Sequence, residues 1–165
     1  MKPTLSYQGE DDPIFLNDRT YRWVITKRFT ADSLTNASPE EVLAALLEQP
    51  GYRHGYDSPE RIDQGPVHGP YRLDAMSPAF FDMVTARRSE EILHEWMDYF
   101  VEQNGPLDKS RILGDIDAAF DLIHGAETRY YLRDLGPEAW RPMGGIVGKF
   151  GFHEFVLLGP TTVLP

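Results

Sequence analysis

The sequence predicts an α+β fold in which a small antiparallel sheet packs against a layer of three to four helices. Strand-like alternation of apolar and polar residues occurs near the N-terminus and again in the C-terminal third, whereas helical periodicity lies between them. The sheet would therefore combine an N-terminal strand with C-terminal strands, an order typical of α+β domains and not of alternating α/β folds. The length of 165 residues fits a single globular domain over 1–165.

The segment 20–30 predicts the N-terminal strand. Tyr21, Trp23 and Ile25 fall on one face of an extended chain, and arginines fall on the other. Aromatic and β-branched residues in this alternation are typical of a strand with one buried face. Residues 1–18 are polar and rich in turn-forming residues, so we expect them to be loosely ordered.

Residues 38–51 predict a helix with a defined start and end. Ser38 suits the N-cap, Pro39 suits the first helical position, and Glu41 can complete a capping box. The apolar residues that follow repeat at helical spacing. A proline–glycine pair at 50–51 then ends the helix.

Further helices are expected in the middle of the chain. Ser77 predicts the start of a helix over 79–88, and Ser89 predicts the start of another over 90–104, although the two can also run on as one. A last helix is expected over 109–125, with a terminal glycine.

The C-terminal part predicts strands again. Residues 128–135 alternate, and residues 145–158 read as one long strand. Gly148 and Gly151 interrupt that strand and suggest a bulge or a bend.

Composition excludes several classes of function. The absence of cysteine excludes disulfides, a thiolate nucleophile and cysteine-ligated metals. The net charge of −10 disfavours nucleic acids and anionic membrane surfaces, because phosphate groups repel an acidic protein. The sequence has neither a signal-peptide pattern nor an apolar run of about 20 residues, so we expect a soluble, cytoplasmic protein.

The candidate catalytic and metal motifs fail on their spacing. The stretch HEWMD at 94–98 resembles the zinc-binding pattern H-E-x-x-H, but Asp98 replaces the second histidine. His153 and Glu154 could form an acid–base pair, but neighbouring strand residues point to opposite faces, so we expect one of them to turn inward. The analysis of the sequence therefore assigns no catalytic residue, no metal ligand and no cofactor.

Acidic residues concentrate in one segment. Between Ser89 and Asp121 there are nine acidic and two basic residues, a local net charge of −7. If the helices here form an antiparallel pair, their outer faces merge into one acidic surface suited to a basic protein partner. The residues that we expect to form this surface are Glu91, Glu95, Asp98, Glu102, Asp117 and Asp121.

A long loop over 51–76 is the second candidate site. Its segment 51–72 contains three tyrosines and three arginines, and both residue types are enriched at binding hot spots. His54, Asp57 and His68 match no metal-ligand spacing. The residues that we expect to contact a partner are Tyr52, Arg53, His54, Tyr56, Arg61 and Tyr71.

These features favour a non-enzymatic acidic protein that occludes a basic partner, most concretely an immunity protein or antitoxin that neutralises a toxin or nuclease. One alternative is a small hydrolase or transferase with a His/Asp acid–base site in the 51–72 loop or at His153. Another alternative is a structural or assembly subunit. The oligomeric state and the identity of the partner do not follow from the sequence.

Overall fold

The computed structural model describes residues 1–15, 23–56, 65–105, 109–145, 151–159 and 162–164. Its centre is a six-stranded antiparallel sheet in the order β1-β4-β10-β9-β8-β7. The strands are β1 (Leu5–Glu10), β4 (Lys27–Ala31), β7 (Phe81–Met83), β8 (Thr128–Leu132), β9 (Phe155–Leu158) and β10 (Thr162–Leu164). The α+β class is confirmed, but the sheet is larger than predicted.

Strand β1 lies in the N-terminal segment that we expected to be loosely ordered. It pairs with β4 from Leu5 opposite Ala31 to Glu10 opposite Lys27, with a bulge between Tyr7 and Gly9. Leu5 alone of its side chains is buried, and this explains why the segment carries no hydrophobic alternation.

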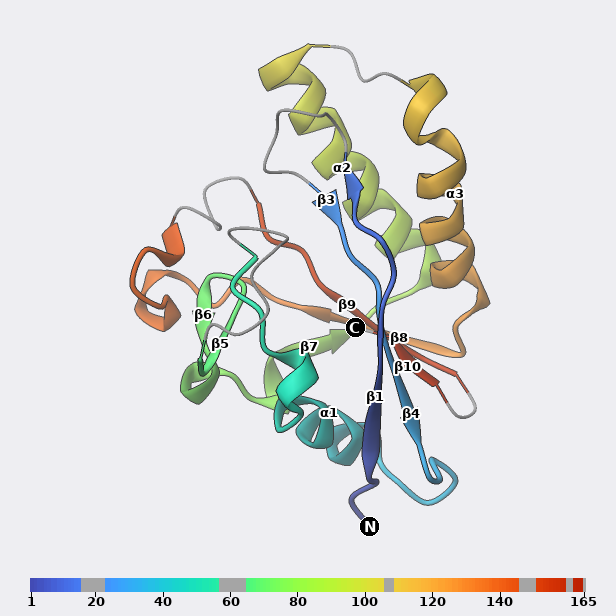
Figure 1. The fold of residues 1–165 in the computed structure, drawn as a ribbon, viewed down its shortest axis with the longest axis vertical. Coiled ribbons are helices and arrows are strands. Elements are labelled where there is room, and N and C mark those ends of the chain that lie inside the picture. Colours follow the sequence, from blue (N-terminus) through green and yellow to red (C-terminus); the bar gives the residue numbers. More distant parts are fainter. Residues whose placement is uncertain (16–22, 57–64, 106–108, 146–150, 160–161, 165) are drawn as a thin grey trace.

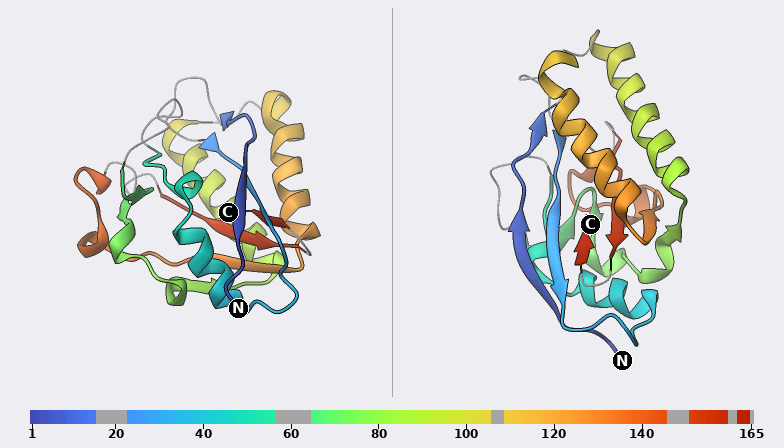
Figure 2. Two further views of the ribbon diagram at one scale, coloured as in Figure 1. Left: turned by 60° about the horizontal axis from the view of Figure 1, so that its bottom comes forward. Right: turned by 90° about the vertical axis from the view of Figure 1, so that its right-hand side faces the viewer.

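The predicted strand over 20–30 is divided. Its described part forms two strands, β3 (Trp23–Val24) and β4, and β3 pairs with β2 (Ile14–Phe15) in a separate ribbon. Figures 1 and 2 show this ribbon beside α2 and α3, away from the six-stranded sheet. A second small ribbon joins β5 (Val67–His68) to β6 (Tyr71–Arg72).

The first helix is confirmed with its cap. Helix α1 (Pro39–Leu47) begins after Ser38, whose hydroxyl accepts a hydrogen bond from the Glu41 amide. The Glu41 carboxylate in turn accepts one from the Ser38 amide at 2.8 Å, which completes the capping box.

The predicted helix over 79–88 is wrong. Ser77 caps only a 3-10 turn over Pro78–Phe80, and the chain then extends into β7. Helix α2 (Ala86–Asn104) starts later, because Thr85 is its N-cap and accepts a hydrogen bond from the Arg88 amide. With α3 (Lys109–Gly125), the described residues contain three α-helices, the lower bound of the prediction.

The predicted strand over 145–158 is also wrong in length. Among the described residues of this range, only β9 is a strand, and residues 151–154 before it are not in one. Gly151 has a φ of +79°, a left-handed conformation that interrupts a strand. Gly148 lies outside the described residues.

The sheet is covered on both faces. Along β9, Val156 and Leu158 belong to the core that includes α1, whereas Phe155 and Leu157 pack with α2 and α3. Burial on both faces explains the unbroken apolar run of this strand. Figure 1 places α1 and the α2–α3 hairpin at opposite ends of the molecule's long axis. None of the helices described is long and apolar enough to cross a bilayer.

Candidate functional site

The acidic surface predicted from the sequence lies on the α2–α3 hairpin. Buried Leu93 and Phe100 anchor α2, and buried Ile116 and Ile123 anchor α3. Because these apolar stripes face inward, the acidic side chains on the same helices face solvent.

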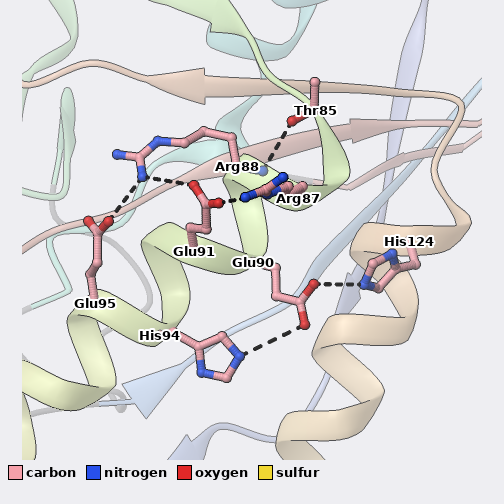
Figure 3. Close-up of polar contacts among 8 residues, drawn as sticks. All are labelled: Thr85, Arg87, Arg88, Glu90, Glu91, His94, Glu95 and His124. Atoms are coloured by element: carbon pink, nitrogen blue, oxygen red, sulfur yellow. Dashed lines mark hydrogen bonds and ion pairs between the residues drawn. The ribbon is translucent and has the colours of Figure 1, made fainter.

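The first turns of α2 are partly neutralised. Figure 3 shows that the Glu91 carboxylate accepts hydrogen bonds from Arg87 at 3.0 Å and Arg88 at 3.4 Å. Arg88 also reaches Glu95 at 3.0 Å. Nearby arginine hydrogen bonds lower the pKa of Glu91, and the bond to Glu95 raises the pKa of Arg88.

These arginines revise the charge of the surface. Because α2 begins at Ala86, the hairpin segment Ala86–Gly125 is counted here; it contains nine acidic and four basic residues, a net charge of −5. The predicted value of −7 omitted Arg87 and Arg88. The hairpin still carries half of the chain's charge of −10.

The remaining predicted acids are exposed. No ion pair joins any of them to another residue whose side chain the structure describes. They are Asp98, Glu102, Asp117 and Asp121. The acidic character of the surface therefore concentrates in the later turns of α2 and on α3.

Glu90 connects the two helices. Its carboxylate lies 3.8 Å from His94 Nε2 on the same helix and 3.3 Å from His124 Nε2 on α3 (Figure 3). The His94 ring stacks on Phe120 of α3, with 5.1 Å between centroids. His94 is 56% exposed and lies against α3 through its ring contact with Phe120. No group of three potential metal ligands occurs among the residues that the structure describes.

Half of the described residues of the second candidate site, the 51–72 loop, are buried. Tyr52 is fully buried, Tyr71 and His54 are each 4% exposed, and His68 is 1% exposed. A protein partner cannot contact these side chains in this conformation. Of the residues expected to contact a partner, Arg53 is exposed, Tyr56 is half-buried, and Arg61 lies outside the described residues, as does Asp57.

His68 and Glu154 form the centre of this buried cluster. His68 Nε2 lies 2.7 Å from Glu154 Oε2, and His68 Nδ1 lies 2.7 Å from the Tyr52 carbonyl oxygen. Because a carbonyl can only accept, Nδ1 carries a proton. A single further proton then holds the His68–Glu154 contact, as an imidazolium–carboxylate pair or as a neutral pair.

Tyr52 closes the cluster from two sides. Its hydroxyl donates to Glu154 Oε1 at 2.8 Å, and its ring stacks on the His68 imidazole with centroids 3.7 Å apart. Burial, followed by the nearby Glu154 charge, raises the pKa of Tyr52 well above its ordinary value. The hydroxyl therefore acts as a donor at neutral pH.

Lys27 places a further ionisable group beside His68, Glu154 and Tyr52. This side chain of β4 is 3% exposed, and its ammonium donates to the carbonyls of Gly51 at 3.0 Å and Tyr52 at 3.4 Å. Burial lowers the pKa of Lys27 to about 8, against the opposing effects of Glu10 and Glu154. The cluster thus ties the loop to β4 and to the residue before β9.

Phe152 and Arg141 enclose the cluster further. The Phe152 ring makes an edge contact with His68, with centroids 5.8 Å apart. Arg141 donates to the carbonyls of Gly69 at 2.9 Å and Gly55 at 3.0 Å. His54 and His68 are too buried in this conformation to touch a bound substrate. Of the other residues named for the acid–base alternative, His153 is exposed and Asp57 lies outside the described residues.

The predicted division of His153 and Glu154 is confirmed. Glu154 points inward at 7% exposure, whereas His153 is exposed and its Nδ1 lies 2.8 Å from the Tyr131 hydroxyl. We did not identify Lys27 from the sequence as a partner of the loop. Its position two residues before Phe29, on the same face of the strand, indicated that it could be buried.

Comparison of the chain with protein-family models, curated proteins and solved structures gives no match.

Proposed function

We propose that the protein is a non-enzymatic binding protein whose acidic α2–α3 surface occludes a basic protein partner. An immunity protein or antitoxin that neutralises a toxin or nuclease in the cytoplasm is its most concrete form. The observation that carries the proposal is the set of exposed acids on this hairpin that lack ion pairs with described residues.

Unpaired carboxylates suit such a role physically. A carboxylate that already has an arginine partner must give up that partner before it can bind another cation. Asp98 and Glu102 have no such ion-pair partner among the residues whose side chains the structure describes. Their electrostatic field can therefore steer a basic surface.

The anchoring of the hairpin adds to this support. Phe100 is 1% exposed and lies two residues from each of these two acids, packed against Ile116 of α3. A surface held by buried anchors presents its charges without first ordering them, which reduces the entropic cost of binding.

The proposal predicts a specific loss on charge reversal. A tagged form of the protein is used to recover partners, and each basic partner is purified and titrated calorimetrically at low and high salt. Asp98→Lys with Glu102→Lys is expected to weaken binding by about tenfold or more at low salt, the change that 1.4 kcal/mol produces.

A matched control carries Glu40→Lys with Glu138→Lys. Both residues are exposed acids outside the hairpin, without ion pairs to described residues, so the total charge change is the same. Equal affinities of the two double variants for every basic partner would show that the proposal is wrong.

A further inference from the structure

A groove of about 550 Å³ lies between α3, the segments around β2 and β3, and the ends of β9 and β10. Its volume falls in the range of about 300–1,000 Å³ that ligand sites occupy. Only part of the acidic hairpin, the inner side of α3, borders it.

Small side chains on α3 create the groove. Ala118, Ala119 and Gly125 line it from one side of the helix, and Ala126 lines it directly after the helix ends. Larger residues at these positions would fill the space between α3 and the neighbouring strands. Short β10, which pairs with β4 only at Thr30 and Phe29 among described residues, leaves the rest of that space uncovered.

The end of α3 that forms this wall is held in place. Arg129 of β8 donates to the carbonyls of Ile123, His124 and Ala126, so its guanidinium caps the last turn of α3. The wall therefore has a fixed position relative to β8 and β9.

The lining is apolar in the middle and acidic at the rim. Leu157, Leu164 and Ile14 contribute aliphatic surface, and Asp12 and Asp121 are exposed at the edge. Neither of these acids has an ion pair with another described residue. The one basic residue of the lining, Arg28, is bound to Asp11 at 2.7 Å.

We infer that this groove binds a short segment of a protein partner in which an aliphatic side chain is flanked by lysine or arginine. The aliphatic side chain enters between α3 and the strands, and the flanking cations pair with Asp12 and Asp121. Charge complementarity selects this occupant, because Asp12 and Asp121, neither of them ion-paired with another described residue, line the groove around an apolar centre. This inference rests on the proposed function. It names the feature of the basic partner that the protein recognises, an aliphatic side chain flanked by cations.

The test uses three fluorescent hexapeptides titrated against the full chain by fluorescence anisotropy. The first contains leucines flanked by lysines, the second replaces leucine with serine, and the third replaces lysine with glutamate. The lysine–leucine peptide is expected to bind saturably. Each replacement is expected to weaken binding by about tenfold or more.

Two kinds of variant locate the site. Ala118→Trp fills the groove from an exposed helix position, and Asp12→Lys with Asp121→Lys reverses its rim. Each is expected to lower the affinity for the lysine–leucine peptide by about tenfold or more. The control Glu138→Lys should leave it unchanged, and circular dichroism verifies that every variant is folded.

The outcomes separate this inference from the proposed function. The groove site is overturned if the peptide does not bind the wild type saturably. It is also overturned if Ala118→Trp and the rim variant both bind the peptide as tightly as the wild type does. Loss of peptide binding in Asp98→Lys with Glu102→Lys alone also overturns it, but leaves the acidic surface of α2 as the binding site. Retention in that variant, with loss in the groove variants, supports the groove.

Discussion

His68 and Glu154 are 86 residues apart in the chain, yet a 2.7 Å contact joins His68 Nε2 to Glu154 Oε2 in the interior. The contact fastens the 51–72 loop to the segment that leads into β9. Glu154 also accepts the Tyr52 hydroxyl, so both of its oxygens are occupied.

We expect Glu154→Gln to destabilise the protein. In the imidazolium–carboxylate form of the contact, glutamine keeps the shape of the side chain but removes the charge that His68 and Lys27 face in a buried setting. The free energy of unfolding, measured by urea denaturation at neutral pH, should fall by about 2–4 kcal/mol. The same change at exposed Glu138 should stay within about 0.5 kcal/mol. Equal effects of the two substitutions would mean that the buried contact contributes nothing.

Lys27 predicts a pH dependence of stability. Its pKa is about 8 in the folded protein and 10.5 ordinarily, so the unfolded chain binds more protons between these values. The penalty for burying the charged amine is complete below pH 8 and disappears as the pH rises toward 10.5. Relative to Lys27→Met, the wild type should gain about 2 kcal/mol of unfolding free energy between about pH 7.5 and 9.5.

Restricting this experiment to pH below about 9.5 avoids the tyrosines, whose ordinary pKa is about 10. Burial raises the pKa of Tyr71 to about 12, and burial also raises the pKa of Tyr52. Their effect has the opposite sign, since stability falls when unfolded tyrosines ionise. A constant difference between wild type and Lys27→Met across the window would contradict the lowered pKa.

Gly69 and Gly65 form a matched pair for a steric prediction. Both have positive φ, +53° and +75°, so alanine is strained at either position. A Cβ at Gly69 would meet the Phe152 ring at 2.6 Å, whereas a Cβ at Gly65 meets no atom within 4 Å. Thermal unfolding should show a loss of about 1–2 kcal/mol for Gly65→Ala and at least about 1 kcal/mol more for Gly69→Ala. Equal losses would show that Phe152 moves aside freely.

Arg129 predicts a local effect on α3. Arg129→Met removes the donors to the carbonyls of Ile123, His124 and Ala126 and should cost about 1–3 kcal/mol. Hydrogen exchange should then speed up in the last two turns of α3. Arg87→Met is the control, since its side chain is 89% exposed and its ion pair lies on the surface. Unchanged exchange in α3 would contradict the capping role.

The parts of the fold that followed from the sequence are those that local chemistry decides. The capping box at Ser38 and Glu41 appears in the structure as expected, because its two hydrogen bonds depend on residues three apart. That one of His153 and Glu154 turns inward followed from the alternation of an extended chain, but not which of the two. The segregation of strands from helices held only in part, because β7 joins the sheet from between α1 and α2.

The errors arose where long-range contacts decide. A proline after Ser77 suits a helix and a 3-10 turn equally, and pairing of Phe81 with Leu132 across the sheet selected the strand. Strand β1 has a single buried side chain, so its pairing with β4 left no pattern to read. At the candidate site, Tyr52 and Tyr71 looked like contact residues, but their hydroxyls donate to Glu154 and Asp134, which no local spacing relates to them.

The pairing of Phe29 in β4 with Val163 in β10 has a consequence for the order of folding. The two halves of the sheet join only through β10, which is the last of its strands to be synthesised. Closing so long a segment of chain is slow, and β4 and β9 expose unpaired backbone edges until it happens. The nascent chain therefore passes through a period in which self-association competes with closure of the sheet.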